Sequence, residues 1–111
     1  MRVDHSQAPG AFAHDIDAFL AFIGLERGLS PNTIAAYRRD LDQAATFLAR
    51  SKLTDWRGVT RAEAGAWIHS LDSKRYKTAT LARKLTAARM LARFLVHEKI
   101  RDDDFTALLS G

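Results

Sequence analysis

Two predicted helices carry an unusual mixture of small, amide and cationic residues on the side that faces solvent. On the first, residues 31–51, the outer positions hold Asn32, Ala35, Ala36, Arg39 and Gln43. An ordinary solvated helix surface is rich in Glu and Lys, which pair at i and i+4. Small residues let a helix backbone come close to a ligand, while Arg, Asn and Gln can reach phosphates and base edges. The chemistry that this face could perform is therefore the binding of a polyanion.

The second helix of this kind runs from about residue 78 to residue 98. When its leucines are placed inward, the outward positions are Ala79, Ala82, Arg83, Thr86, Arg89, Met90 and Arg93. Two helices with such faces would suit two successive entries into the major groove of a duplex. Ala is also the best helix former and Arg a good one, so either face taken alone is better explained as ordinary helix surface.

The charge of the chain is concentrated around the second of these helices. The whole chain carries a net charge of +4, whereas residues 71–100 hold eight Lys or Arg and two Asp or Glu, a net of +6. The remaining residues therefore sum to −2. A basic block in an otherwise mildly acidic domain is typical of a face that binds nucleic acid, although a solvated helix surface has the same composition.

The length and composition limit the class of protein. A chain of 111 residues with 47% apolar residues can bury one hydrophobic core and forms a single domain. It has no cysteine, which excludes disulfides and thiolate metal sites. The sequence shows neither an export leader nor an apolar run long enough to span a membrane, and it predicts a cytoplasmic protein.

Apolar periodicity predicts an all-α fold, a compact bundle of four main helices plus a short C-terminal helix. The predicted parts are a flexible N-terminal arm over residues 1–10, then helices at about 11–26, 31–51, 61–71 and 78–98, and a last short helix within 105–109. Ser30 followed by Pro31 predicts one helix start, and Thr60 with Glu63 predicts a capping box at another. Residues 11–109 are expected to form the folded domain.

Other chemistry finds little support in the sequence. The four histidines, His5, His14, His69 and His97, lack the spacing of metal ligands. The three aspartates at 102–104 are better explained as a helix cap than as a cation site. We therefore expect no metal, no cofactor and no small-molecule ligand. Phe22 and Leu25 fall beside the main apolar stripe of their helix and are expected to be exposed.

Two segments together resemble a known family. "ERGLSPNTIAAYRRDL" and, after about forty residues, "TATLARKLTAARMLARFLVHEKIRDDD" are similar to the N-terminal core-binding (SAM-like) domain of tyrosine site-specific recombinases. The likeness covers Phe12 to Leu109 and is nearest to the bacterial Xer type, XerD more than XerC. It rests on the patterns S-x-x-T-x-x-x-Y-x-x-D-L and R-x-L-[ST]-A-x-R, which are specific in combination. Phe105 stands where members of the family commonly have proline.

The resemblance implies that the helices at 31–51 and 78–98 cross in the major groove of a recombination half-site. It places Thr33, Ala36, Arg39, Thr80, Arg83 and Thr86 near DNA and assigns Arg38, Lys77, Lys84 and Arg89 to phosphates rather than bases. Asn32 and Gln43 join this set because they lie on the same outer face. Thr33 and Thr80 stand near helix starts, where a side chain and a backbone N–H can hold a phosphate together.

The resemblance also implies what the whole protein does. Such recombinases cut DNA through a tyrosine nucleophile, aided by Arg, Lys and His groups, and act as four subunits on two sites. For the Xer type this resolves chromosome dimers at cell division. Those catalytic motifs belong to a C-terminal domain, and neither Tyr37 nor Tyr76 lies in the nucleophile's motif, so this chain is expected to bind DNA without cutting it.

Two alternatives remain open at the level of sequence. Within the family, the close alternative to the Xer type is a phage, plasmid or transposon integrase. Outside it, a helical protein-interaction module with a solvated basic face has the same composition. Salt dependence separates the second alternative, because a DNA face loses affinity steeply as salt rises.

Overall fold

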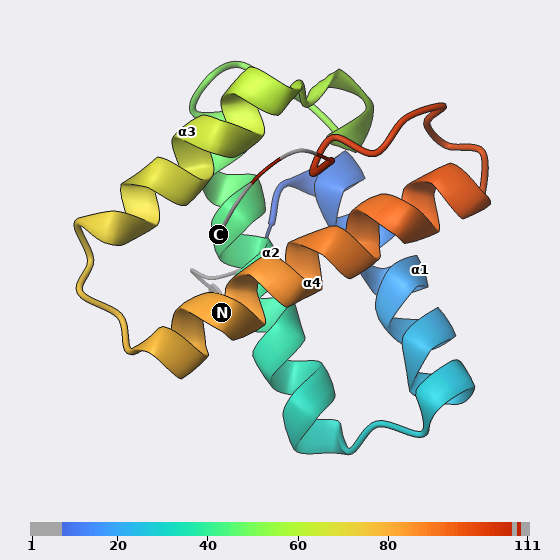
Figure 1. The fold of residues 1–111 in the computed structure, drawn as a ribbon. Coiled ribbons are helices and arrows are strands. Elements are labelled where there is room, and N and C mark those ends of the chain that lie inside the picture. The colour runs from blue at the N-terminus through green and yellow to red at the C-terminus, as the bar shows by residue number, and fades with distance from the viewer. Residues whose placement is uncertain (1–7, 108, 110–111) are drawn as a thin grey trace, which may run out of the picture.

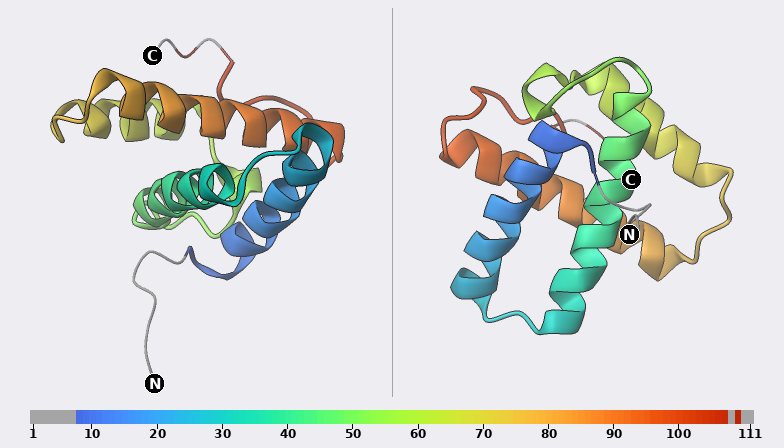
Figure 2. Two further views of the ribbon diagram at one scale, coloured as in Figure 1. Left: turned by 90° about the horizontal axis from the view of Figure 1, so that it is seen from below. Right: turned by 180° about the vertical axis from the view of Figure 1, so that it is seen from behind.

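The computed structural model describes residues 8–107 and 109, which form helices, turns and loops with no strand among them. The helices are α1 (Gly10–Arg27), α2 (Pro31–Ala49), α3 (Arg61–Asp72) and α4 (Thr78–His97), and a short 3-10 helix η1 (Trp56–Gly58) precedes α3. α1 and α2 run side by side in opposite directions, and α4 crosses over both (Figure 1). Views from below and from behind show the same arrangement (Figure 2). The predicted all-α bundle is confirmed.

The helix ends follow the local signals in the sequence. The Ser30 hydroxyl accepts a hydrogen bond from the Thr33 backbone N–H at 3.2 Å, and Pro31 occupies the first helical position of α2. Thr60 and Glu63 form the predicted capping box at the start of α3. Gly28 ends α1 in the left-handed conformation, with φ at 59°, where a residue with a Cβ would be strained.

The core forms where α1, α2 and α4 meet. Its centre consists of fully buried apolar residues, namely Phe12, Ile16, Phe19, Leu41, Ala45, Leu48, Ala87, Leu91 and Leu95. Aromatic contacts connect α1 to α4, since the rings of Phe19 and Phe94 lie 5.7 Å apart. α3 packs mainly against α2 and contributes Trp67 and Leu71 to the core, as predicted.

The C-terminal segment is held against the core by aromatic stacking and by an arginine. Phe105 is buried and stacks on Trp56, with ring centroids 5.9 Å apart, and the Trp56 indole donates to the Phe12 carbonyl at 3.1 Å. Arg101 donates to the Trp56 carbonyl at 2.8 Å and also to the carbonyl of Val59. Phe105, which departs from the family pattern, is therefore a core residue of this chain.

Both ends of the domain differ from the sequence-based prediction. Residues 1–7 of the predicted arm lie outside the described residues, but Ala8 is buried and α1 already begins at Gly10. At the other end, the predicted short helix is a set of turns over residues 105–107, with an i to i+3 hydrogen bond from the Ala107 N–H to the Asp104 carbonyl. Asp104 does cap the Thr106 N–H at 2.7 Å, but a segment this short cannot offset the cost of helix nucleation.

Candidate nucleic-acid interface

A buried carboxylate holds α2 and α4 together where they cross. Asp40 of α2 is 1% exposed and accepts hydrogen bonds from Arg83 Nε at 2.7 Å and from Arg83 Nη2 at 3.0 Å. It also accepts from Lys84 Nζ at 2.9 Å. The Arg83 contact is bidentate, a geometry that fixes direction as well as distance. One carboxylate therefore sets both the packing of α4 on α2 and the orientation of Arg83.

Lys84 belongs to the interior of this crossing. Its side chain is only 4% exposed, its ammonium donates to Gln43 Oε1 at 2.6 Å, and it lies 4.7 Å from the ring centroid of Tyr76. The resemblance implies that Lys84 contacts a phosphate, but its ammonium is buried at the helix crossing and does not face solvent. A buried ammonium is stable only when paired, and Asp40 provides the pairing across the helix crossing.

Arg83 lies at the edge of the same network and reaches solvent. Its side chain is 37% exposed, and only Nε and Nη2 face Asp40. The guanidinium has five N–H donors in all, so most of its donors are left for a ligand. The hydrogen bond to Asp40 raises the pKa of Arg83 above its ordinary value, and burial opposes this only in part. Arg83 is thus a permanently charged donor held in a preset direction.

The crossing brings several of the predicted residues into one surface. Gln43 and Arg39 are exposed on α2, Ala36 is half-buried beside them, and Thr80 lies one helical turn before Arg83 and Lys84. The Lys84–Gln43 hydrogen bond joins the two helices at this surface. We call Ala36, Arg39, Gln43, Thr80 and Arg83 the crossing face.

The other predicted residues surround the crossing face or turn away from it. Asn32 near the start of α2, Lys77 directly before α4 and Thr86 three residues after Arg83 are exposed, and we call these three its exposed borders. The Thr33 N–H, expected to help hold a phosphate, is already bound by the Ser30 cap.

Two predicted cations are engaged by other parts of the fold. Arg38 Nη1 donates to Asp17 Oδ1 of α1 at 2.7 Å, and Arg89 Nη2 donates to the Leu109 carbonyl at 3.0 Å. Arg38 therefore faces α1, and Arg89 faces the C-terminal segment. Either residue would have to share or release its partner to bind phosphate.

The outer face of α4 is narrower than its leucines suggest. Met90, expected outside, is buried at 8% exposure, and Ala87 and Phe94 are buried with it. Leu81 and Leu85, expected to face inward with the other leucines, are only partly buried. The buried side of α4 is thus rotated from the leucine stripe, because α1 and α2 cover one flank and the C-terminal segment covers the other.

Phe22 and Leu25 are exposed as predicted, at 38% and 89%. His5 lies outside the described residues, and among those described no group of His, Cys, Asp or Glu could hold a metal ion. No helix in the described part of the chain is long and apolar enough to cross a membrane.

Sequence reasoning missed Asp40 as a functional residue. Asp40 is the aspartate of the S-x-x-T-x-x-x-Y-x-x-D-L pattern, but the spacing of residues along one helix does not show which side chains of another helix lie opposite them. The sole available signal was that Asp40 precedes Leu41 on the inward half of α2, where an acidic residue needs a cationic partner.

Comparison with known proteins identifies the domain type. The family model described as "Phage integrase, N-terminal SAM-like domain" matches residues 16–99. The chain is 41% identical over 95 residues to the tyrosine recombinase XerD of Bradyrhizobium diazoefficiens, covering 84% of this chain and 29% of that protein. It is also 41% identical over 95 residues to XerD of Proteus mirabilis, covering 86% of this chain and 30% of that protein.

XerC proteins match as well. The tyrosine recombinase XerC of Herpetosiphon aurantiacus is 41% identical over 80 residues, which are 72% of this chain and 26% of that protein. The chain thus spans about three tenths of the length of the curated relatives it matches. It belongs to the phage integrase N-terminal SAM-like domain family, and the relatives named above are the tyrosine recombinases XerD and XerC.

Proposed function

We propose that this chain is the DNA-binding domain of a Xer-type tyrosine recombinase and that α2 and α4 enter the major groove of a recombination half-site. The observation that carries the proposal is the crossing of α2 and α4 at Asp40, which sets Arg83 beside the outer residues of α2. Small and amide residues next to an oriented arginine match the requirements of base-edge and phosphate contact. The net charge of +6 over residues 71–100 supplies the attraction to DNA.

The contacts are proposed for the crossing face and its exposed borders. Arg39, Gln43 and Arg83 are the candidates for base reading, and Asn32, Thr33, Ala36, Lys77, Thr80 and Thr86 approach the groove walls or the phosphates. Arg38 and Arg89 reach phosphate only if they release their present partners. Lys84 acts from the interior by holding Gln43 and sharing Asp40 with Arg83.

The whole protein, on this proposal, cuts and rejoins DNA strands through a phosphotyrosine intermediate, as four subunits on two sites. The catalytic tyrosine and its Arg, Lys and His partners would come from a further domain, and this chain would bind without cutting. Similarity to XerD and XerC proteins supports a role in chromosome dimer resolution in the cytoplasm. An integrase of a mobile element is the alternative within the family.

The proposal is tested by an NMR titration of the domain with a duplex carrying a Xer-type half-site and with a scrambled duplex. We expect amide shifts confined to α2, α4 and the loops that flank them, stronger for the half-site. A face that neutralises about six phosphates gives a log–log salt slope near −5. If no shifts appear even at low salt, the Ala and Arg faces are ordinary helix surface, and the protein-interaction alternative replaces this proposal.

Arg83→Ala tests the role of the oriented guanidinium. If Arg83 reads a base, the preference for the half-site falls by roughly 5- to 150-fold, because one bidentate base contact is worth about 1–3 kcal/mol. If it holds only a phosphate, affinity falls equally for both duplexes. Arg61→Ala, which removes an exposed arginine from the start of α3, is the matched control and should leave both affinities unchanged. An Arg83→Ala variant with wild-type binding to both duplexes would contradict the assignment.

A further inference from the structure

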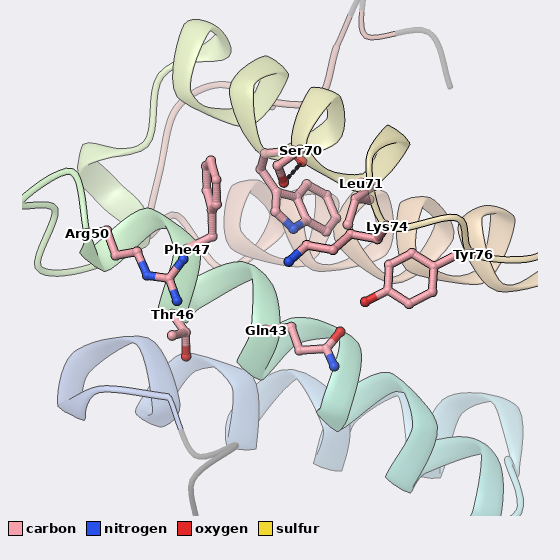
Figure 3. Close-up of a pocket in the computed structure, with 9 residues that line it drawn as sticks. Gln43, Thr46, Phe47, Arg50, Ser70, Leu71, Lys74 and Tyr76 are labelled. Carbon is pink, nitrogen blue, oxygen red and sulfur yellow. Dashed lines mark hydrogen bonds between the residues drawn. The ribbon is translucent and has the colours of Figure 1, made fainter.

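A groove of about 240 Å³ lies beside the crossing face, between the second half of α2, the end of α3 and the loop that leads to α4. Polar side chains from all three segments line it, namely Gln43, Thr46, Arg50, Ser70, Lys74 and Tyr76. In Figure 3 the ammonium of Lys74 and the hydroxyl of Tyr76 both point from the loop side toward α2. We call this the α2–loop groove.

The α2–loop groove is positively charged. Arg50 and Lys74 are both exposed, come from different parts of the chain and line the same space. No carboxylate is among the lining residues, and neither cation forms an ion pair within the described part of the chain. The hydroxyls of Thr46 and Tyr76 add neutral donors. An anion with several oxygens is the ligand that such a set of donors would bind.

The ends of α2 and α3 account for only part of this arrangement. A cation near a helix C-terminus is favoured by the helix dipole, and Arg50 and Lys74 each follow such an end. The dipole does not explain why the two cations, from separate segments, line one groove together with the donors of Thr46 and Tyr76.

The groove is continuous with the crossing face, because Gln43 belongs to both. Arg50 lies seven residues beyond Gln43, which is about 10 Å along a helix that rises about 1.5 Å per residue. The major groove is roughly 12 Å wide. A helix that places Gln43 at base edges therefore brings Arg50 to the sugar–phosphate strand at the border of the groove.

We propose that the α2–loop groove binds a phosphodiester of the DNA strand that borders the major groove occupied by α2 and α4. This inference rests on the proposed function and adds Arg50 and Lys74 as phosphate contacts, with the Tyr76 hydroxyl as a further donor. It makes the loop between α3 and α4 part of the interface and fixes how far α2 enters the groove.

The test compares the salt dependence of duplex binding by the wild-type domain and by Arg50→Ala/Lys74→Ala. Loss of two phosphate contacts lowers the magnitude of the log–log slope by about 1.8. It also weakens binding to half-site and scrambled duplexes by the same factor, because phosphates carry no sequence information. The matched control is Arg57→Ala/Arg61→Ala, which removes two exposed arginines at the other end of α3 and should keep the wild-type slope.

The outcomes separate the two proposals. If the wild-type domain binds no duplex, the proposed function fails, and this inference fails with it. If the wild type binds and Arg50→Ala/Lys74→Ala keeps the slope, or changes it no more than the control does, only the groove inference is overturned. A parallel NMR titration with inorganic phosphate at constant ionic strength should shift Lys74 and Tyr76 with far weaker affinity than the duplex does, because free phosphate lacks the contacts that α2 and α4 make in the major groove. Phosphate that binds there as tightly as the duplex would make the groove a free-anion site and overturn its assignment to DNA.

Discussion

Replacing Asp40 by alanine should cost the domain far more stability than replacing an exposed carboxylate. Asp40 is 1% exposed and pairs with two cations at 2.7–3.0 Å. Arg83, with a side chain 37% exposed, can turn its guanidinium to water once Asp40 is gone. Lys84 cannot do the same, since it is 4% exposed and would retain only the Gln43 oxygen and the Tyr76 ring as partners. The loss of stability in Asp40→Ala therefore comes mainly from the Lys84 ammonium, which stays buried without a carboxylate partner.

Breaking a buried ion pair by removing one partner costs about 3–5 kcal/mol. A domain of this size has a free energy of unfolding of roughly 5–15 kcal/mol, so Asp40→Ala should remove about a fifth of it or more. At about 4 °C per kcal/mol, the melting temperature should fall by roughly 12–20 °C. Asp17→Ala is the matched control, because it breaks the exposed pair with Arg38 and should cost less than about 1 kcal/mol.

A second variant separates this explanation from simple loss of packing. In Asp40→Ala/Lys84→Met the apolar stem of Lys84 is kept and the ammonium is removed, so no charge is left buried without a partner. We expect the double variant to recover more than half of the loss in urea unfolding experiments. The reasoning is refuted if Asp40→Ala costs no more than Asp17→Ala, or if the double variant is no more stable than the single one.

Two further predictions concern Lys84, which is buried, and Phe105, which stands where the family commonly has proline. Lys84→Met alone should leave the salt slope of duplex binding close to wild type, measured by fluorescence anisotropy, because a buried ammonium contacts no phosphate; a slope reduced by about 0.9 would show direct contact. Phe105→Ala should lower the free energy of unfolding by about 3–5 kcal/mol in urea titrations, because it removes a buried ring stacked on Trp56; a loss below about 1 kcal/mol would mean that the C-terminal segment contributes little to the core.

The sequence was sufficient to predict the helices and most of their ends, because those features depend on neighbouring residues. The capping box at Thr60 and Glu63 and the cap at Ser30 are local hydrogen bonds, and both are present. The segments whose structure the sequence predicts wrongly depend instead on residues far away in the chain. Residues 105–107 form turns where Phe105 packs on Trp56, a residue almost fifty positions earlier in the chain. The 3-10 helix at Trp56 is likewise too short to leave a periodic pattern.

The orientation of the candidate site could be predicted only in part, for a related reason. A helical wheel separates the apolar from the polar side of one helix, and it correctly turned Arg39, Gln43 and Thr86 outward. It cannot tell which of two adjacent cations will be buried when both pair with one carboxylate on another helix. Arg83 and Lys84 look alike in the sequence, yet Asp40 draws Lys84 into the interior and leaves Arg83 at the surface.

That difference connects the stability of the fold to the proposed recognition of DNA. The same two oxygens of Asp40 fix the crossing of α2 and α4 and the direction of Arg83. A change that loosens the crossing would therefore also free the guanidinium to adopt other directions, and a freely rotating arginine still attracts phosphates but discriminates poorly between bases. Variants at Asp40 that remain folded should consequently lose preference for the half-site before they lose affinity for DNA in general.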